Sequence, residues 1–78
     1  IGRKMQEDPE VPNYFTGRRG PRLEPGMALA IEPMITLGSP DICLDENQWT
    51  VSTIDKKPAA HYENTTILTK NGLEILTL

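Results

Sequence analysis

Two glutamates lie in stretches of the chain where an ionised side chain is unexpected. Glu32 interrupts the most apolar stretch, residues 27–35, and no Lys or Arg lies within several positions of it. Glu63 lies in a second strand-like stretch, residues 59–69. An ionised carboxylate among apolar neighbours costs free energy unless a cation, a metal ion or several donors receive it. Two such residues from distant segments of a β-scaffold therefore suggest a metal site for a divalent ion such as Mn²⁺, Fe²⁺, Co²⁺, Zn²⁺ or Mg²⁺.

A histidine precedes the second glutamate by two positions. Because alternate residues of a strand point to the same face, His61 and Glu63 are expected to face one cavity if residues 59–69 form a single strand. The alternative is that Glu63 makes an ordinary ion pair and His61 is a surface histidine. The residues alone leave both interpretations open.

Three other features carry weaker signals. Trp49 is the only tryptophan and is interpreted first as a core residue. Cys43 is the only cysteine, so no disulfide can form within the chain, and a lone cysteine fits a reducing cytoplasm. A basic cluster lies in a Gly/Pro-rich loop without interleaved aromatic residues, which is weak support for nucleic-acid binding; it consists of Arg18, Arg19 and Arg22.

The pattern along the chain predicts strands and turns rather than helices. Proline and glycine punctuate residues 7–26. Pro33 cannot donate to a strand ladder, so the first strand should break or reach an edge there. The expected elements are a strand tail at 1–6, strands at 27–35, 48–54, 59–69 and 73–78, a hairpin-like connection at 55–58 and a turn at 70–72.

The bulk properties limit what the chain can form alone. Its 78 residues allow at most one domain, and its net charge of −3 is too small to define a partner. No apolar run approaches the roughly 20 residues of a membrane span, and no signal peptide is evident. A mostly β segment needs a layer to cover its apolar face, and no covering helix is expected here, which predicts that the chain is part of a larger fold.

Several strings occur in one order along the whole chain. They are Ile1-Gly-Arg-Lys-Met-Gln-Glu-Asp-Pro9, Val11-Pro-Asn-Tyr14, Gly20-Pro-Arg-Leu-Glu-Pro-Gly-Met27, Ala30-Ile-Glu-Pro-Met34, Trp49-Thr-Val51 and His61-Tyr-Glu-Asn-Thr65. Together they closely resemble the C-terminal part of bacterial type I methionine aminopeptidases. The resemblance implies an α+β pita-bread fold in the full protein. Residues 1–78 would be mostly antiparallel strands and loops, forming the C-terminal segment of one metallopeptidase catalytic domain whose N-terminal part is missing.

The resemblance also implies roles for individual residues. In the family, two aspartates, one histidine and two glutamates hold two divalent ions, which would be Co, Mn, Fe or Zn. The glutamates match Glu32 and Glu63, and the other ligands would lie before Ile1. The methionine pocket matches Met5 and Trp49, which changes the interpretation of Trp49 from core to pocket wall.

Two positions beside these residues complete the implied site. Gln6 occupies the place of a histidine that contacts the scissile peptide, and a glutamine amide donates a hydrogen bond but cannot shuttle a proton. His61 matches a variable position and is expected at the second shell or pocket edge rather than as a ligand.

The implied activity is metal-dependent removal of the N-terminal methionine from nascent proteins with a small second residue. Glu32 would also carry a proton to the departing amine. The expected setting is cytoplasmic, with the nascent chain as partner, the ribosome as a further candidate, and no membrane or specific nucleic acid. The isolated chain is expected to be inactive.

Two alternatives remain open from the sequence. One is a non-catalytic pita-bread relative, or decayed copy, that acts as a binding module. The other is a small β-module that binds RNA through the three clustered arginines.

Overall fold

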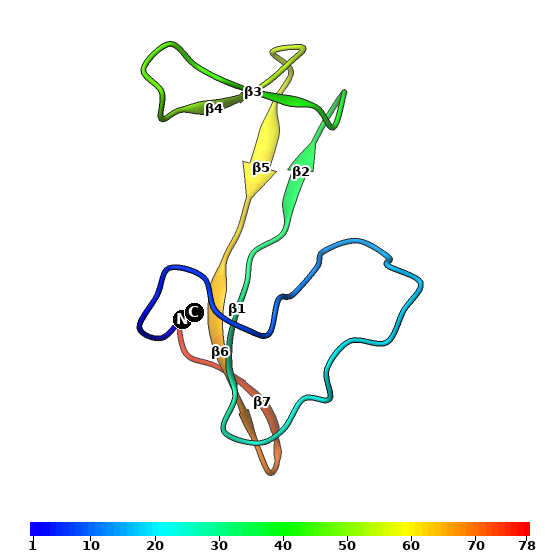
Figure 1. The fold of residues 1–78 in the computed structure, drawn as a ribbon, viewed down its shortest axis with the longest axis vertical. Helices are drawn as coiled ribbons and strands as arrows, with labels where there is room; N and C mark the ends of the chain where they lie inside the picture. The colour runs from blue at the N-terminus through cyan, green and yellow to red at the C-terminus, as the bar shows by residue number, and fades with distance from the viewer. The chain divides into compact units, whose positions relative to one another are not determined.

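The computed structural model describes all residues from Ile1 to Leu78 and contains seven short β-strands and no helix. It therefore contains no helix that is long and apolar enough to span a membrane. Residues 1–27 are loops and turns without a strand (Figure 1), which corrects the expected strand tail at residues 1–6. The strands are β1 (Ala28–Ile31), β2 (Met34–Thr36), β3 (Ile42–Leu44), β4 (Val51–Thr53), β5 (Ala59–His61), β6 (Asn64–Thr69) and β7 (Gly72–Ile75).

The chain divides into two compact units, and the first contains residues 1–32 and 63–78. Its centre is an antiparallel sheet with the strand order β1-β6-β7 (Figure 1). The expected turn at residues 70–72 joins β6 to β7, and Gly72 there has a φ of 120°. Glycine adopts such a φ without the steric cost that a Cβ imposes, so a tight antiparallel connection forms at this point.

The interior of the first unit is small. Leu29 is 6% exposed and Thr66, its partner across β1 and β6, is 2% exposed. The Thr66 hydroxyl donates to the Leu29 carbonyl at 2.9 Å, so its burial leaves no unsatisfied donor. Large apolar side chains elsewhere in the chain remain exposed, among them Phe15, Leu37 and Leu78. The expectation that these residues cannot cover their own apolar surface is confirmed.

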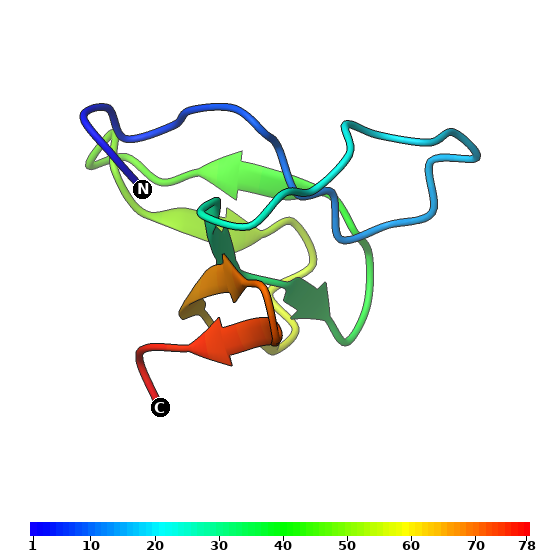
Figure 2. The same ribbon diagram turned by 90° about the horizontal axis from the view of Figure 1, so that it is seen from below.

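The second unit contains residues 33–62 and two separate strand pairs, β2 with β5 and β3 with β4. Figure 2 shows β3 and β4 side by side, in green and yellow-green. Residues 55–58 connect β4 to β5, which pair with different strands, so the expected hairpin-like connection is wrong. β3 was also not expected, because the acidic residues around Cys43 resemble a loop.

A carboxylate organises the turns of the second unit. Asp55 accepts hydrogen bonds from the backbone N–H of Ser39 at 2.7 Å and of Lys57 at 3.1 Å. These two hydrogen bonds hold the pKa of the Asp55 carboxyl below its ordinary value of 3.8, and the one from Ser39 has the larger effect. A Cβ at Gly38 would collide with a carboxylate oxygen of Asp55, so a larger residue there would displace the Asp55 side chain from its hydrogen-bonded position.

Candidate metal centre

Both glutamates lie where an expected strand is interrupted. β1 ends at Ile31 and β2 begins at Met34, so Glu32 lies in the gap beside Pro33. The break at Pro33 was expected, because proline has no N–H to donate to a ladder. In the second case β5 ends before Glu63 and β6 begins after it. The expectation of one continuous strand over residues 59–69 is therefore wrong.

The register between β1 and β6 brings the two glutamates together. Ile31 is the Cα partner of Asn64 in this antiparallel pair. Glu32 is the residue after Ile31, and Glu63 is the residue before Asn64. Because the two strands run in opposite directions, Glu32 and Glu63 are the next two positions that face each other beyond the Ile31–Asn64 pair. Two carboxylates that lie 31 positions apart in sequence thus become neighbours.

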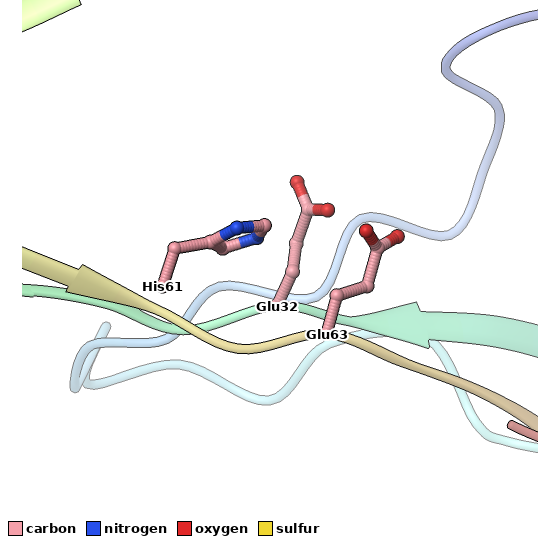
Figure 3. Close-up of side chains that lie close together, drawn as sticks. All are labelled: Glu32, His61 and Glu63. Carbon is pink, nitrogen blue, oxygen red and sulfur yellow. The ribbon is translucent and has the colours of Figure 1, made fainter. Parts of the chain in front are cut away.

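The side chains form a group that can hold a metal ion. Glu32, His61 and Glu63 each offer one ligand atom, and these atoms lie within 4.8 Å of one another. Glu32 is half-buried, whereas Glu63 and His61 are exposed. Figure 3 shows the Glu32 and Glu63 carboxylates extending from the same side of the ribbon. His61 is the last residue of β5 and pairs with Met34 of β2.

The donor set of the two glutamates suits a divalent ion. Oxygen ligands bind such an ion at about 2.0–2.2 Å, so two ligands of one ion lie at most about 4.4 Å apart. The separation within 4.8 Å is close to that limit. Two carboxylates at this distance also repel each other, and a divalent ion between them would convert that repulsion into attraction. Carboxylate and imidazole ligands favour Mn²⁺, Fe²⁺, Co²⁺ or Zn²⁺.

The residues expected to bind substrate lie in loops. Met5 is 91% exposed, and Gln6 lines a shallow hollow together with Lys4, Glu7, Asp8 and Glu10. Trp49 belongs to the second unit, in the connection between β3 and β4, and is 83% exposed. The initial interpretation of Trp49 as a core residue is wrong for this chain, and its place in a substrate pocket stays a prediction.

Residue types alone could not place the two glutamates side by side. Their apolar surroundings and the His61-x-Glu63 spacing indicated a possible metal site. The pairing of Ile31 with Asn64 required the strand register, and no turn motif between β1 and β6 sets that register. The structure also shows that a ring nitrogen of His61 lies within 4.8 Å of a carboxylate oxygen of each glutamate.

Comparisons with known proteins show which family the chain resembles. The model of metallopeptidase family M24 matches residues 1–70. Methionine aminopeptidases of Clostridium perfringens and Clostridium acetobutylicum are each 56% identical to the chain over 78 residues, which is 100% of this chain and 31% of each relative. The crystal structure of methionine aminopeptidase from Thermotoga maritima matches with a TM-score of 0.85 and 48% identity, over 91% of this chain and 28% of that chain.

These matches determine the family and the extent of the likeness. The chain spans less than a third of the length of the curated relatives that it matches. The similarity to the Thermotoga maritima structure confirms the expected fold, in which this segment of a pita-bread protein consists of antiparallel strands and loops. With the family model matching most of the chain, we conclude that the chain belongs to metallopeptidase family M24.

Proposed function

We propose that the protein removes the N-terminal methionine from nascent polypeptides whose second residue is small, by metal-dependent hydrolysis. The observation that carries this proposal is the pairing of Ile31 with Asn64, which makes Glu32 and Glu63 neighbours with ligand atoms within 4.8 Å. Membership of family M24 and 56% identity to proteins named methionine aminopeptidase support it.

We further propose that residues 1–78 are the C-terminal segment of one catalytic domain. In support, the chain matches only 31% of the length of its Clostridium perfringens relative. The resemblance implies that two aspartates and a histidine from the rest of that domain would join Glu32 and Glu63. Two carboxylates alone leave most coordination positions of two ions to other ligands, so the remaining ligands are needed for tight binding.

In the proposed mechanism the two glutamates have related but distinct roles. Glu32 and Glu63 would hold the metal through carboxylate oxygens. Two divalent ions bound there would supply Lewis acidity, which lowers the pKa of an attacking water and polarises the peptide carbonyl. Glu32 also accepts a proton and passes it to the departing amine, a role open to a carboxylate within hydrogen-bond reach.

The family resemblance assigns substrate recognition to three side chains. Met5 and Trp49 would each contribute to binding of the methionine side chain, and Gln6 would donate a hydrogen bond to the scissile peptide. His61 would lie at the edge of that binding site. The substrate is the N-terminus of a nascent polypeptide in the cytoplasm, with the ribosome as a further partner.

The test is methionine release by the full-length protein. The protein is stripped with a chelator, reloaded separately with Mn²⁺, Co²⁺, Fe²⁺ or Zn²⁺, and given peptides that begin Met-Ala or Met-Phe. We expect free methionine from the Met-Ala peptide with at least one metal, little from the Met-Phe peptide, and none without metal.

Two results would contradict this proposal. Release that persists unchanged after complete metal removal would exclude the mechanism. No release with any of the four metals, together with retained metal binding, would instead favour a non-catalytic relative that acts as a binding module.

A further inference from the structure

The chain continues to contact β6 after β7 has ended. β7 ends at Ile75, yet the backbone N–H of Leu76 donates to the Thr65 carbonyl at 2.9 Å. The next residue, Thr77, accepts a hydrogen bond at its Oγ1 from the backbone N–H of Thr65 at 2.8 Å. The same hydroxyl donates to Oδ1 of Asn64 at 3.4 Å. All of these contacts lie within the first unit, one or two residues after Glu63.

The Thr77 hydroxyl takes the place of a backbone carbonyl in the sheet. Thr66 pairs with Ile75 across β6 and β7, so the next pair in register is Thr65 with Leu76. In an antiparallel ladder a hydrogen-bonded pair exchanges two N–H···O bonds. The Leu76 N–H makes the first of them, and the second goes from the Thr65 N–H to the Thr77 side chain instead of to the Leu76 carbonyl.

This arrangement supports the residue after Glu63 from both sides. On one side β1 reaches Asn64 through its pairing with Ile31. On the other side, beyond the end of β7, Thr77 reaches Asn64 and Thr65. A strand end with a partner on one side only opens more easily than one held on both, so Thr77 restrains the backbone from which Glu63 projects.

We propose that Thr77 is a positioning residue for Glu63 and raises the affinity of the glutamate pair for a divalent ion. This inference rests on the proposed function, because it takes Glu63 as a metal ligand. Groups that hydrogen-bond a metal ligand directly typically change metal affinity by about 10- to 100-fold. Thr77 acts through the backbone next to Glu63, so its effect should lie at the lower end of this range. The hydroxyl carries the effect, because it makes both hydrogen bonds. The methyl group of Thr77 is not required.

The experiment measures Mn²⁺ binding to the full-length protein by calorimetry, with Mn²⁺ as the only ligand. Thr77→Val removes the hydroxyl and keeps the shape, whereas Thr77→Ser keeps the hydroxyl. Thr69→Val is the matched control, because the Thr69 hydroxyl also lies on β6 and donates to the Gly72 carbonyl at 2.8 Å, but at the far end from Glu63. Melting temperatures are recorded for all variants.

We expect Thr77→Val to weaken Mn²⁺ binding by about 10-fold, with Thr77→Ser and Thr69→Val close to wild type. Unchanged binding in Thr77→Val would overturn the inference. An equal loss in Thr69→Val would overturn it as well, because general loosening of the sheet would then account for both.

Glu63→Gln separates failure of this inference from failure of the proposed function. If Glu63→Gln weakens Mn²⁺ binding and Thr77→Val does not, only the role of Thr77 is wrong. If Glu63→Gln leaves Mn²⁺ binding unchanged, Glu63 is not a ligand, and both proposals fail.

Discussion

At the scale of single residues, Glu32 and Glu63 differ in exposure although the register makes them neighbours. Glu32 is half-buried and Glu63 is exposed. The proposed mechanism gives Glu32 two roles, as a metal ligand and as the proton carrier that the family resemblance implies, and gives Glu63 one role, as a metal ligand.

The assignment of both glutamates as metal ligands leads to a prediction for two single substitutions in the full-length protein. Glu32→Gln and Glu63→Gln should each lower kcat for a Met-Ala peptide by about 100-fold or more, because even groups outside the coordination sphere account for 10- to 100-fold. Glu74→Gln on β7 is the control, since that glutamate is exposed and lies outside the metal-binding group. Full activity in either variant would show that the ligand assignment is wrong.

Gln6 offers a second test at this scale. The resemblance places a histidine at this position, and a histidine both donates a hydrogen bond and carries a proton. Gln6→His should therefore raise kcat, by up to about 100-fold if the donor at this position stabilises developing charge on the substrate. The measurement is steady-state methionine release across pH. An unchanged kcat would mean that the glutamine amide already serves as an adequate donor.

The sequence indicated which residues could bind a metal, but it did not indicate which residues position them. Glu32 could be identified from the sequence, because a carboxylate in an apolar stretch needs a partner. Thr77 gave no signal, because a threonine in a terminal strand looks like any β-former. The role proposed for Thr77 depends on a hydrogen bond to Thr65, which lies 12 positions away in sequence and is brought close by the β6–β7 register.

At the scale of elements, the strands are shorter than the sequence pattern predicts. Residues 59–69 are rich in threonine and β-branched side chains, so propensity favours one long strand. The structure divides them around Tyr62 and Glu63, because β5 pairs with β2 and β6 pairs with β1. Pairing partners decide where a strand ends, and propensity does not contain that information.

The hydrogen bonds that Asp55 accepts should make the turns of the second unit sensitive to acid. Its pKa lies below the ordinary 3.8, because the ionised carboxylate accepts the N–H groups of Ser39 and Lys57. A depressed pKa in the folded state stabilises the protein above the unfolded pKa, and this contribution is lost as pH falls through the folded value. Below about pH 4 the wild type should therefore lose stability faster than Asp55→Asn, which keeps an acceptor oxygen without the charge.

Urea unfolding of the full-length protein between pH 2 and 7, about the range over which carboxylates titrate, measures this difference. Amide shifts of Ser39 and Lys57 report the same titration locally. Identical pH dependence in wild type and Asp55→Asn would contradict the assigned role of the carboxylate.

At the scale of the whole molecule, the described residues bury little apolar surface. Leu29 is the single buried hydrophobic residue, and large side chains such as Trp49 and Met34 are exposed. A domain of this length buries only about 60% of its unfolded surface even when compact. The sequence anticipated this result correctly, because no segment had the pattern of a covering helix.

This small core predicts how residues 1–78 behave in isolation. The isolated chain should show amide exchange close to that of an unfolded peptide over most positions, and it should release no methionine. Hydrogen exchange and the Met-Ala assay measure the two properties. Strong protection across β1, β6 and β7 would mean that the sheet is stable without further covering.

The most direct test of the central claim is anomalous scattering from a crystal of the full-length protein soaked in Mn²⁺. We predict an anomalous peak within about 2.0–2.2 Å of carboxylate oxygens of both Glu32 and Glu63. A peak that contacts neither glutamate, or no peak in their vicinity at saturating Mn²⁺, would contradict the account.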